Sequence, residues 1–286
     1  MALGTKIQGA ALTLRGLGAR GLLLEALRRL MGRPYRLGGL LISDHRAFRA
    51  LRAVSLRGYG IRISDGALLV ETPWALLSAP IDERGLHIDL LAVLSEDLEG
   101  MYGALDVDGR VVLDIGAYMG ETTLLFLWRG ARRVVAFEPV RDYFEILKSN
   151  IELNGAGEAV DAFNRGVWRR HGPIQLEKRG VATGLWVPAE GKGNASEALS
   201  LGEALSIPGT SDLAVKMDCE GCEYSLLVEP CNTLTRATQY VVEIHGSPTI
   251  LIDKMNECGY RAELVRVLHK PGDLVPLSIW SFTSTR

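Results

Sequence analysis

The stretch 110–123 reads RVVLDIGAYMGETT and decides the fold class. An apolar strand pattern ends in Asp114, a turn containing Gly116 and Gly120 follows, and a helical pattern then begins at Thr122. A strand that enters a helix through a glycine-rich turn is the place where doubly wound α/β folds bind nucleotide-like cofactors. Glycine is needed there because the backbone turns tightly and the ligand approaches it closely.

The spacing of this turn is D-x-G-x-x-x-G, whereas the turn that cradles a pyrophosphate reads G-x-G-x-x-G. A carboxylate at the strand end suits a cofactor that carries an ammonium group and no phosphates. The missing third glycine therefore disfavours an NAD-dependent oxidoreductase, which we keep as an alternative.

The following strand pattern, 133–137, ends in Glu138, which lies 22 positions after Gly116 (138 − 116). An acid about 20 residues beyond the turn is where such folds bind the ribose hydroxyls of the cofactor. Two carboxylates at adjacent strand ends, with glycines between them, predict a pocket for S-adenosyl-L-methionine.

From about residue 100 onward the chain resembles the class I S-adenosylmethionine-dependent methyltransferases of the FkbM family. The matching stretches occur in order: VVLDIGAYMGETT, VVAFEP, NIELNG, AVKMDCEGCE and VVEIH. After the fourth strand the family pattern is roughly K-I-D-V-E-G-x-E, which is matched by Lys216, Asp218, Glu220, Gly221 and Glu223. The resemblance implies methyl transfer, usually to an oxygen of a small molecule or sugar, and the acceptors differ widely between members.

The fold that we expect is α/β, a Rossmann-like class I methyltransferase fold with a seven-stranded, mostly parallel sheet and helices on both faces. Residues 101–286 form the methyltransferase domain in this prediction, and an antiparallel hairpin at 262–268 and 277–283 completes its sheet. Inserted strands are expected at 174–176 and 184–187, and a loop at 190–196.

Residues 1–100 are predicted to form an N-terminal α+β extension. Helices are expected at 10–31, 44–54 and 88–102. Asp65-Gly66 is a strong type I′ turn signal, so 58–71 is predicted to form a hairpin, with a third strand at 74–78.

The residues expected to hold the cofactor fall into three segments. The turn after the first strand holds the methionine part. Glu138 follows the second strand and holds the ribose, with Pro139 next to it as a further cofactor-binding residue. Gly166 and Val167 follow the third strand and line the adenine. The turn contributes Asp114, Gly116, Ala117, Tyr118, Gly120 and Thr122.

The predicted catalytic residues are Asp218, Glu220 and His245, which follow the fourth and fifth strands. Methyl transfer to a hydroxyl needs an aligned acceptor and a base, and these acids are the best-placed carboxylates. The alternatives are structural. Glu220 or Glu223 could simply occupy the first turn of a helix, where the macrodipole favours acids, and His245 could be a structural residue. Lys216 is expected to form an ion pair within the motif.

A divalent metal held by Asp218, Glu243 and His245 is a further alternative, because some small-molecule O-methyltransferases use acids at these strand ends. The Asp-Asn pair expected after the fifth strand for such a site is absent, and we therefore predict no metal ligand.

The four cysteines of this chain predict no disulfide framework. Cys219 and Cys222 form a C-x-x-C, but Cys231 and Cys258 lie apart in the sequence. No second pair stands at zinc spacing, so we expect packing residues, with a redox or metal role as the alternative.

Charge is unevenly distributed. Residues 1–60 carry 11 Lys or Arg and two acids, a net charge of +9, although the whole chain carries −2. Such asymmetry indicates either a helical cap whose arginines cover acidic surface or a contact with nucleic acid. Apolar runs of about 18 residues are absent and basic residues interrupt the N-terminal stretch, so we expect neither a membrane span nor a signal peptide, and hence a cytoplasmic protein.

The leading functional prediction is O-methylation of a small-molecule or glycan hydroxyl. An RNA methyltransferase that uses the basic N-terminal segment is the second hypothesis. Against it, the fourth strand is followed by Asp218-Cys-Glu-Gly221, which lacks the Asn-Pro-Pro-aromatic or Asp-Pro-Pro-aromatic pattern of amino-methylating enzymes.

Overall fold

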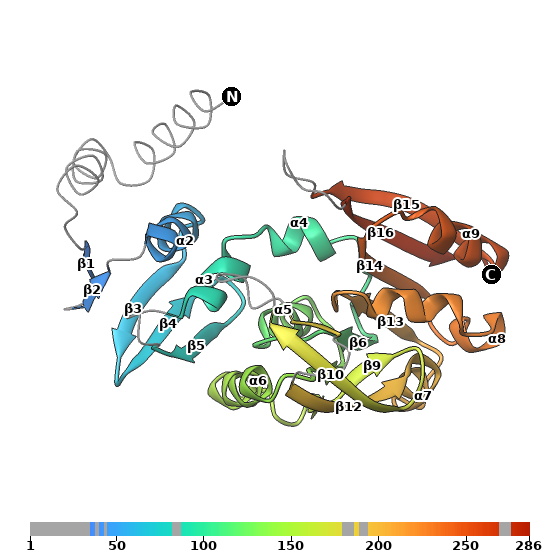
Figure 1. Cartoon of the computed structure of the whole chain (residues 1–286), viewed down its shortest axis with the longest axis horizontal. Helices are drawn as coiled ribbons and strands as arrows, with labels where there is room; N and C mark the ends of the chain where they lie inside the picture. The colour runs from blue at the N-terminus through green and yellow to red at the C-terminus, as the bar shows by residue number, and fades with distance from the viewer. Residues whose placement is uncertain are drawn as a thin grey trace. The chain divides into compact units, whose positions relative to one another are not determined.

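The computed structural model describes residues 35–37, 40–42, 45–81, 87–178, 186–188, 194–268 and 276–286. The helix expected at 10–31 lies outside these residues. The chain divides into two compact units, one through Glu96 and one from Asp97 onward, and Figure 1 shows their helices and strands. The assignment of 1–100 and 101–286 as functional domains stays a prediction.

The N-terminal unit contains a three-stranded antiparallel sheet in the order β3-β4-β5. Asp65 and Gly66 have φ angles of 51° and 75°, as a type I′ turn requires, so the predicted hairpin is confirmed. The described elements of this unit are β1 Tyr35–Leu37, β2 Leu40–Ile42, α2 His45–Leu56, β3 Gly60–Ser64, β4 Ala67–Glu71, β5 Leu76–Pro80 and α3 Ile88–Leu94.

The single helix predicted at 88–102 is wrong. The chain forms α3, which ends before Ser95, and a separate short helix, α4 Leu98–Tyr102. Asp97 is the N-cap of α4, and its side chain accepts a hydrogen bond from the Gly100 N–H. A capping Asp starts a new helix more readily than it continues one, and the boundary between the two units falls at this break.

The second unit contains the seven-stranded sheet, in the order β15-β16-β14-β13-β6-β7-β8. The five strands from β14 to β8 are parallel to one another, and β16 runs antiparallel to β14 and β15, so the predicted fold class is confirmed. The strands are β6 Val111–Ile115, β7 Arg133–Phe137, β8 Val160–Phe163, β13 Leu213–Met217, β14 Gln239–His245, β15 Tyr260–Val267 and β16 Leu277–Ser284.

Helices cover both faces of this sheet. On one face Leu113, Val215 and Val242 pack with residues of the later helices, in one hydrophobic cluster. On the other face α5 contacts β6 and β7, and α6 contacts β8. The helices are α5 Glu121–Trp128, α6 Arg141–Leu153, α7 Leu201–Ser206, the 3-10 helix η1 Cys222–Leu227, α8 Cys231–Leu234 and α9 Thr249–Glu257.

The chain leaves β6 toward β7 on one side, and later adds β13 and β14 on the other side of β6. The strand order therefore reverses between β6 and β13. Ligands in open α/β sheets bind beyond the carboxyl ends of the strands at such a switch point. We call the glycine-rich turn after β6, residues 116–120, the elbow. The elbow and the acids after β13 meet at this switch point.

A four-stranded sheet is inserted between β8 and β13, in the order β11-β10-β12-β9. The strand predicted at 174–176 is confirmed within β10 Gly172–Lys178. The predicted loop at 190–196 is wrong in its described part, because β12 Asn194–Ser200 begins there. β12 pairs with both β10 and β9 Gly166–Trp168, and this pairing outweighs the weak strand propensity of its sequence. The remaining strand is β11 Trp186–Pro188.

The cysteine prediction is wrong. Cys231 at the start of α8 is bonded to Cys258 at the end of α9, and Cys219 is bonded to Cys222. The Cα–Cα distances of 4.9 and 5.4 Å lie in the usual disulfide range. A separation of 27 residues carries no sequence signal, because the folding of β14 and α9 between the two cysteines brings them together.

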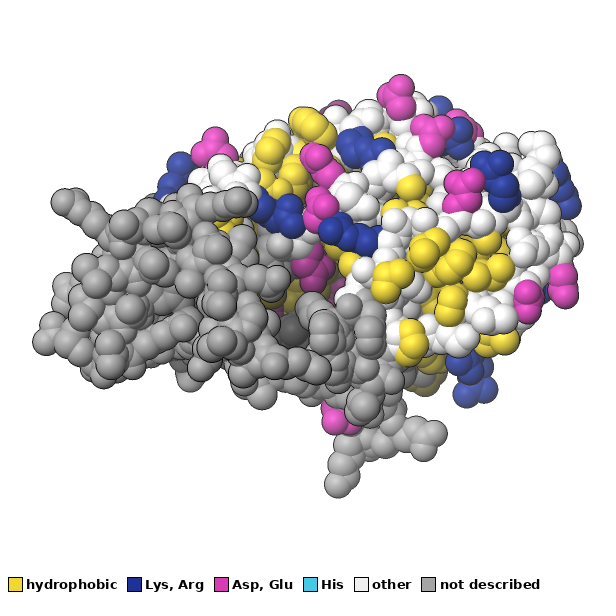
Figure 2. All heavy atoms as spheres, turned by 90° about the horizontal axis from the view of Figure 1, so that it is seen from above, with side chains coloured by type: hydrophobic (Ala, Val, Ile, Leu, Met, Phe, Trp, Pro, Cys, Tyr) yellow, Lys and Arg dark blue, Asp and Glu magenta, His cyan; other side chains and the backbone are white. Residues whose placement is uncertain are grey.

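The described surface mixes its side-chain types. On the face shown in Figure 2, acidic and basic side chains alternate, and hydrophobic side chains gather in a patch among them. None of the described helices combines the length and apolar character that a membrane crossing needs.

Candidate cofactor and acceptor site

The elbow after β6 is a strained, closely packed loop. Gly116, Tyr118 and Gly120 have φ angles of 78°, 50° and 95°, in the left-handed region that favours glycine. A Cβ on Gly116 would come within 1.8 Å of the Asp218 carbonyl oxygen, so only glycine fits. The N–H groups of Gly116 and Ala117 both donate to the Phe137 carbonyl, which holds the loop against β7.

Asp114 is completely buried and has partners from the chain itself. Its Oδ2 accepts hydrogen bonds from the hydroxyls of Thr122 and Thr123, at 2.8 and 2.7 Å. Its Oδ1 lies 3.1 Å from Lys216 Nζ, which confirms the expected ion pair of Lys216. The structure therefore gives no support to a direct contact of Asp114 or Thr122 with the cofactor.

Strand register explains this ion pair. Lys216 is the register partner of Asp114 on the parallel strand β13, and both side chains point to the face covered by α5. Burial alone would lower the pKa of Lys216, but the charges of Asp114 and Asp218 outweigh it and raise the pKa. Lys216 also donates to the Gly116 carbonyl at 2.6 Å, so the pair supports the elbow from beneath.

Glu138 lies beside the elbow. Its Oε2 accepts the Tyr118 N–H at 2.9 Å and its Oε1 accepts the Val140 N–H at 2.8 Å. Burial raises the pKa of this carboxyl to about 8, although the two N–H donors act in the opposite direction. Glu138 thus links the elbow to the start of α6, and its carboxyl oxygens have further lone pairs for ribose hydroxyls.

The residues assigned to the adenine also lie near Glu138. Asn164 donates to the carbonyl oxygens of Glu138 and Pro139. A Cβ on Gly166 would stand 3.6 Å from the Pro139 Cβ, which places these two predicted residues together. Val167 is buried in the hydrophobic cluster, so it packs beneath the adenine segment and does not face the ligand.

Sequence reasoning missed Glu121, the first residue of α5. Its side chain is buried and its Oε2 accepts the Met119 N–H at 3.2 Å. Burial raises the pKa of this carboxyl to about 8, and the nearby charges of Asp114 and Asp218 act in the same direction. Its only sequence signal is its position directly after Gly120.

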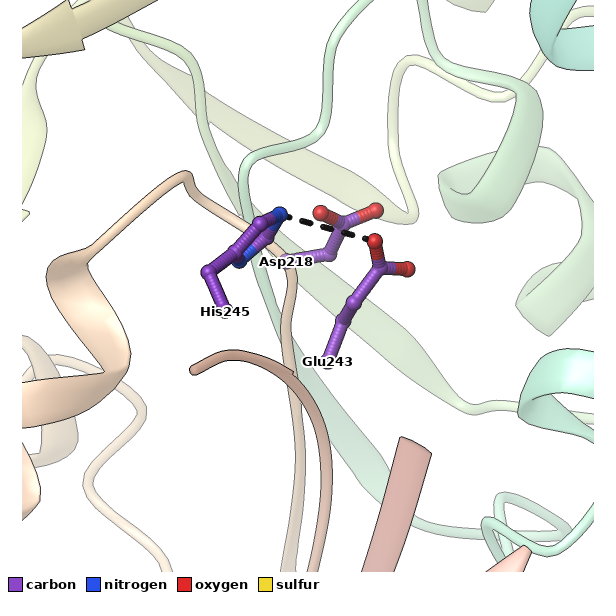
Figure 3. Close-up of side chains that lie close together, drawn as sticks. All are labelled: Asp218, Glu243 and His245. Carbon is purple, nitrogen blue, oxygen red and sulfur yellow. Dashed lines mark ion pairs between the residues drawn. The ribbon is translucent and has the colours of Figure 1, made fainter. Parts of the chain in front are cut away.

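A second group, shown in Figure 3, consists of Asp218, which follows β13, and of Glu243 and His245 at the end of β14. Met217 is the register partner of Val242, so continuing the register by one residue sets Asp218 beside Glu243. Side chains alternate along a strand, so Glu243 and His245 share one face. The donor atoms of Asp218, Glu243 and His245 all lie within 4.8 Å of one another.

His245 is surrounded by carboxylates. Its Nε2 lies 2.9 Å from Glu220 and 3.6 Å from Glu243, and its Nδ1 lies 3.2 Å from Glu223. Burial alone would lower the pKa of His245, but hydrogen bonds to Glu220 and Glu223, together with their charges, raise it to about 11. A protonated imidazole does not accept a proton, so His245, which was predicted as a catalytic residue, is poorly suited to act as a general base.

Glu223 and Tyr102 complete this corner, and neither was predicted as a site residue. Glu223 is fully buried and accepts the backbone N–H groups of Gly221 and His245, at 2.7 and 3.0 Å. The Tyr102 hydroxyl, from α4, donates to Asp218 Oδ2 at 2.7 Å. Nothing in the local sequence links Tyr102 to Asp218, which lies 116 residues further along the chain.

The disulfide between Cys219 and Cys222 encloses Glu220 and Gly221. Both enclosed residues have left-handed φ angles, 55° and 114°. The expectation that these cysteines are only packing residues is therefore corrected. The short covalent loop holds Glu220 in a conformation that a non-glycine residue rarely adopts.

A doubly wound sheet, with a glycine elbow after its first strand and an acid after its second, is a fold that binds nucleotide-like cofactors, and it agrees with the predicted class I S-adenosylmethionine-dependent methyltransferase fold. The chain belongs to the FkbM methyltransferase family, because the model of the methyltransferase FkbM domain matches residues 114–262, just over half of the chain. It is a methyltransferase whose cofactor is S-adenosylmethionine, so the alternative of an NAD-dependent oxidoreductase is set aside.

Solved methyltransferase structures resemble the chain distantly. TYW2 of M. jannaschii in complex with AdoMet is 14% identical, with 77% of this chain and 87% of that chain covered and a TM-score of 0.45. A SAM-dependent methyltransferase from Agrobacterium tumefaciens is 11% identical, with 78% and 71% covered and a TM-score of 0.45. TrmK of M. capricolum in complex with S-adenosyl-homocysteine is 10% identical, with 66% and 68% covered and a TM-score of 0.41.

Likenesses at this level carry no argument about the acceptor. None of the curated proteins compared with the chain matches it.

Proposed function

We propose that this protein methylates a hydroxyl oxygen of a small molecule or glycan. The observation that carries the proposal is the position of Asp218. This residue directly follows β13, and its backbone carbonyl oxygen packs against Gly116 of the elbow. Asp218 thus lies beside the loop assigned to the methionine part of the cofactor, which carries the methyl group.

In the proposed reaction the acceptor oxygen attacks the methyl carbon in line with the carbon–sulfur bond. The new carbon–oxygen bond forms as the carbon–sulfur bond breaks, and the sulfonium becomes the neutral thioether of S-adenosylhomocysteine. The hydroxyl proton passes to Asp218. Holding the acceptor close and aligned supplies much of the acceleration, and a positioned base typically adds about 10²–10⁴-fold.

The other members of the corner have positioning roles in this proposal. Tyr102 donates to one oxygen of Asp218 and so orients the second oxygen toward the acceptor. Glu220 and Glu223 hold the imidazole of His245 between them. Glu138 binds the ribose, and Pro139 and Gly166 lie at the adenine end.

Asp218→Asn tests the proposal. Hydroxylated small molecules and sugars would be screened with isotopically labelled S-adenosylmethionine, and the variant assayed on the best acceptor. We expect turnover to fall by roughly tenfold or more, with S-adenosylhomocysteine affinity little changed. Tyr102→Phe keeps the ring and removes one donor to Asp218, so it should lower turnover less. Wild-type turnover in Asp218→Asn would contradict the assignment of the base.

An RNA acceptor is the second candidate, favoured by the net charge of +9 in residues 1–60. Among the described residues in Figure 2, basic side chains alternate with acidic ones, which offers no broad positive surface on that face. If RNA is the acceptor, tRNA should bind with steep salt dependence, and deleting residues 1–55 should abolish binding. We expect no appreciable RNA affinity at about 150 mM salt.

A cytoplasmic location also stays a proposal, and the structure adds an observation against it. Two disulfides are unusual in reducing compartments, where thiols are kept reduced. Counting free thiols in protein freshly extracted from its native cells decides this: four free thiols per chain would favour the cytoplasm.

A further inference from the structure

Three potential metal ligands converge at the acceptor corner. Asp218 follows β13, and Glu243 and His245 lie on one face of the adjacent strand β14. Figure 3 shows the three side chains turned toward one another, with an ion pair between His245 and Glu243. Two carboxylates and one imidazole form a set that suits divalent cations.

The spacing of these donors is close to what one cation needs. Oxygen and nitrogen ligands at about 2.0–2.2 Å from a metal lie about 3–4 Å from one another. The three donor atoms lie within 4.8 Å of one another, so small side-chain rotations would bring them to that spacing. Asp218 and His245 are partly exposed, which leaves a path for a cation and for an acceptor oxygen.

A second observation concerns the far side of the imidazole. His245 Nδ1 lies 3.2 Å from Oε1 of the fully buried Glu223, which the backbone N–H groups of Gly221 and His245 hold in place. Metal-binding histidines almost always donate their second ring N–H to a carboxylate or carbonyl, and this contact fixes the ring. Here it directs Nε2 toward the acids of the corner: Glu220 lies at 2.9 Å and Glu243 at 3.6 Å, and the Asp218 donor atom lies within 4.8 Å of the other two ligands.

The charges around His245 also favour a bound cation. The carboxyl groups of Asp218, Glu220, Glu223 and Glu243 surround one imidazole, and the neighbouring Lys216 is already paired with Asp114. The protonated imidazole offsets one of these charges, and gathering the other carboxylates in a partly buried corner is costly without a further cation. A divalent cation that replaces the imidazole proton would add one net positive charge at the point where the acids converge.

We propose that Asp218, Glu243 and His245 bind a divalent cation of the Mg²⁺ or Mn²⁺ class. The cation takes the place of the imidazole proton that Nε2 shares with Glu220, and that proton leaves to solvent. The remaining coordination positions are open to water and to the acceptor hydroxyl, whose acidity the cation raises. This catalytic use rests on the proposed function, but the binding of the cation does not.

The test is a titration of the full chain with Mn²⁺, followed by electron paramagnetic resonance, in the presence of S-adenosylhomocysteine. We expect one saturable site per chain, from which Mg²⁺ displaces Mn²⁺. Asp218→Asn and Glu243→Gln should each weaken binding by roughly tenfold or more. Asp253→Asn, on the exposed side of α9, should leave it unchanged.

Thermal unfolding and S-adenosylhomocysteine affinity report whether each variant is folded. Absence of saturable binding to the wild type, or equal affinity in folded Asp218→Asn and the wild type, overturns the proposal. Methyl transfer that continues in EDTA overturns the catalytic use of the cation and leaves the proposed function standing. A cation site without any hydroxyl acceptor supports the binding proposal and counts against the proposed function.

Discussion

Gly116 and Asp218 are in contact across the carboxyl ends of two parallel strands: a Cβ on Gly116 would come within 1.8 Å of the Asp218 carbonyl oxygen. The pair joins the elbow assigned to the cofactor to the acids assigned to the acceptor. The distance between the two subsites is therefore set by backbone contact, which changes less readily than side-chain rotamers.

Gly116→Ala should consequently disrupt the site as well as the fold. Moving the strands apart adds to the cost of a left-handed alanine, which is about 1–2 kcal/mol by itself. We expect a clear fall in melting temperature and weaker binding of S-adenosylhomocysteine, measured by calorimetry. Gly155→Ala is the matched control, because Gly155 also has a positive φ, 65°, but nothing lies within 4 Å of its added Cβ. Equal effects of the two variants would contradict the packing argument.

Glu138→Ala should weaken the binding of S-adenosylhomocysteine. The change removes the proposed ribose acceptor and also the acceptor of the Tyr118 and Val140 N–H groups. Hydrogen bonds to charged groups typically contribute about 1.5–3 kcal/mol, so above the Glu138 pKa of about 8 the loss of affinity in calorimetry should be roughly 10- to 100-fold. Glu145→Ala, an exposed acid on α6, is the control. An unchanged affinity in Glu138→Ala would remove the main argument for the ribose site.

His245 should stay protonated through neutral pH when divalent cations are removed with EDTA. Its pKa is raised above the ordinary 6.5 to about 11 because Glu220 and Glu223 outweigh its burial. The imidazole resonances of His245 in NMR should therefore show no titration between about pH 6 and 9. A midpoint near the ordinary histidine value would show that the carboxylates do not hold the proton.

The raised pKa of His245 also makes the stability of the fold depend on pH. A base whose pKa rises on folding stabilises the fold most below its unfolded pKa, and this contribution is lost as pH rises through the folded pKa, at most about 1.4 kcal/mol per unit. The destabilisation caused by His245→Gln should thus be largest near pH 6 and smaller near pH 10, as measured by urea unfolding. A penalty that is independent of pH would indicate lost packing instead.

The two disulfides should differ in what their removal affects. Cys231–Cys258 closes a loop across 27 residues, and Cys219–Cys222 spans only three. On the chain-entropy model Cys231→Ser costs roughly 3–4 kcal/mol of stability and Cys219→Ser roughly 2 kcal/mol. Cys219→Ser should have the larger effect on turnover, because the short loop holds Glu220. Denaturant unfolding measures the loss of stability, and a methyl-transfer assay measures the loss of turnover. A larger stability loss in Cys219→Ser together with a larger turnover loss in Cys231→Ser would contradict this prediction.

Local patterns were sufficient for the fold class and for most strands. Hydrophobic runs, glycine spacing and the Asp65-Gly66 turn act through neighbouring residues, so they can be interpreted without tertiary contacts. The errors occurred where distant pairing outweighs local preference. Asn194–Ser200 forms a strand because β10 and β9 lie on either side of it, and residues 88–102 break where Asp97 caps a new helix.

The candidate site divides in the same way. The sequence located Glu138, Gly116, Asp218 and His245 at strand ends, and the register of parallel strands makes such ends meet. It could not show that Asp114 is enclosed by Lys216, Thr122 and Thr123, because burial depends on which strand and helix lie alongside.

By itself the sequence therefore determined the doubly wound fold, the family and the cofactor, since the elbow and its acid are encoded within about 30 consecutive residues. Only the tertiary structure decided which carboxylates face a ligand and which face the core. It paired Tyr102 with Asp218, bonded Cys231 to Cys258 and set His245 among four acids. Those contacts join residues far apart in the chain, and strand pairing and helix packing determine them.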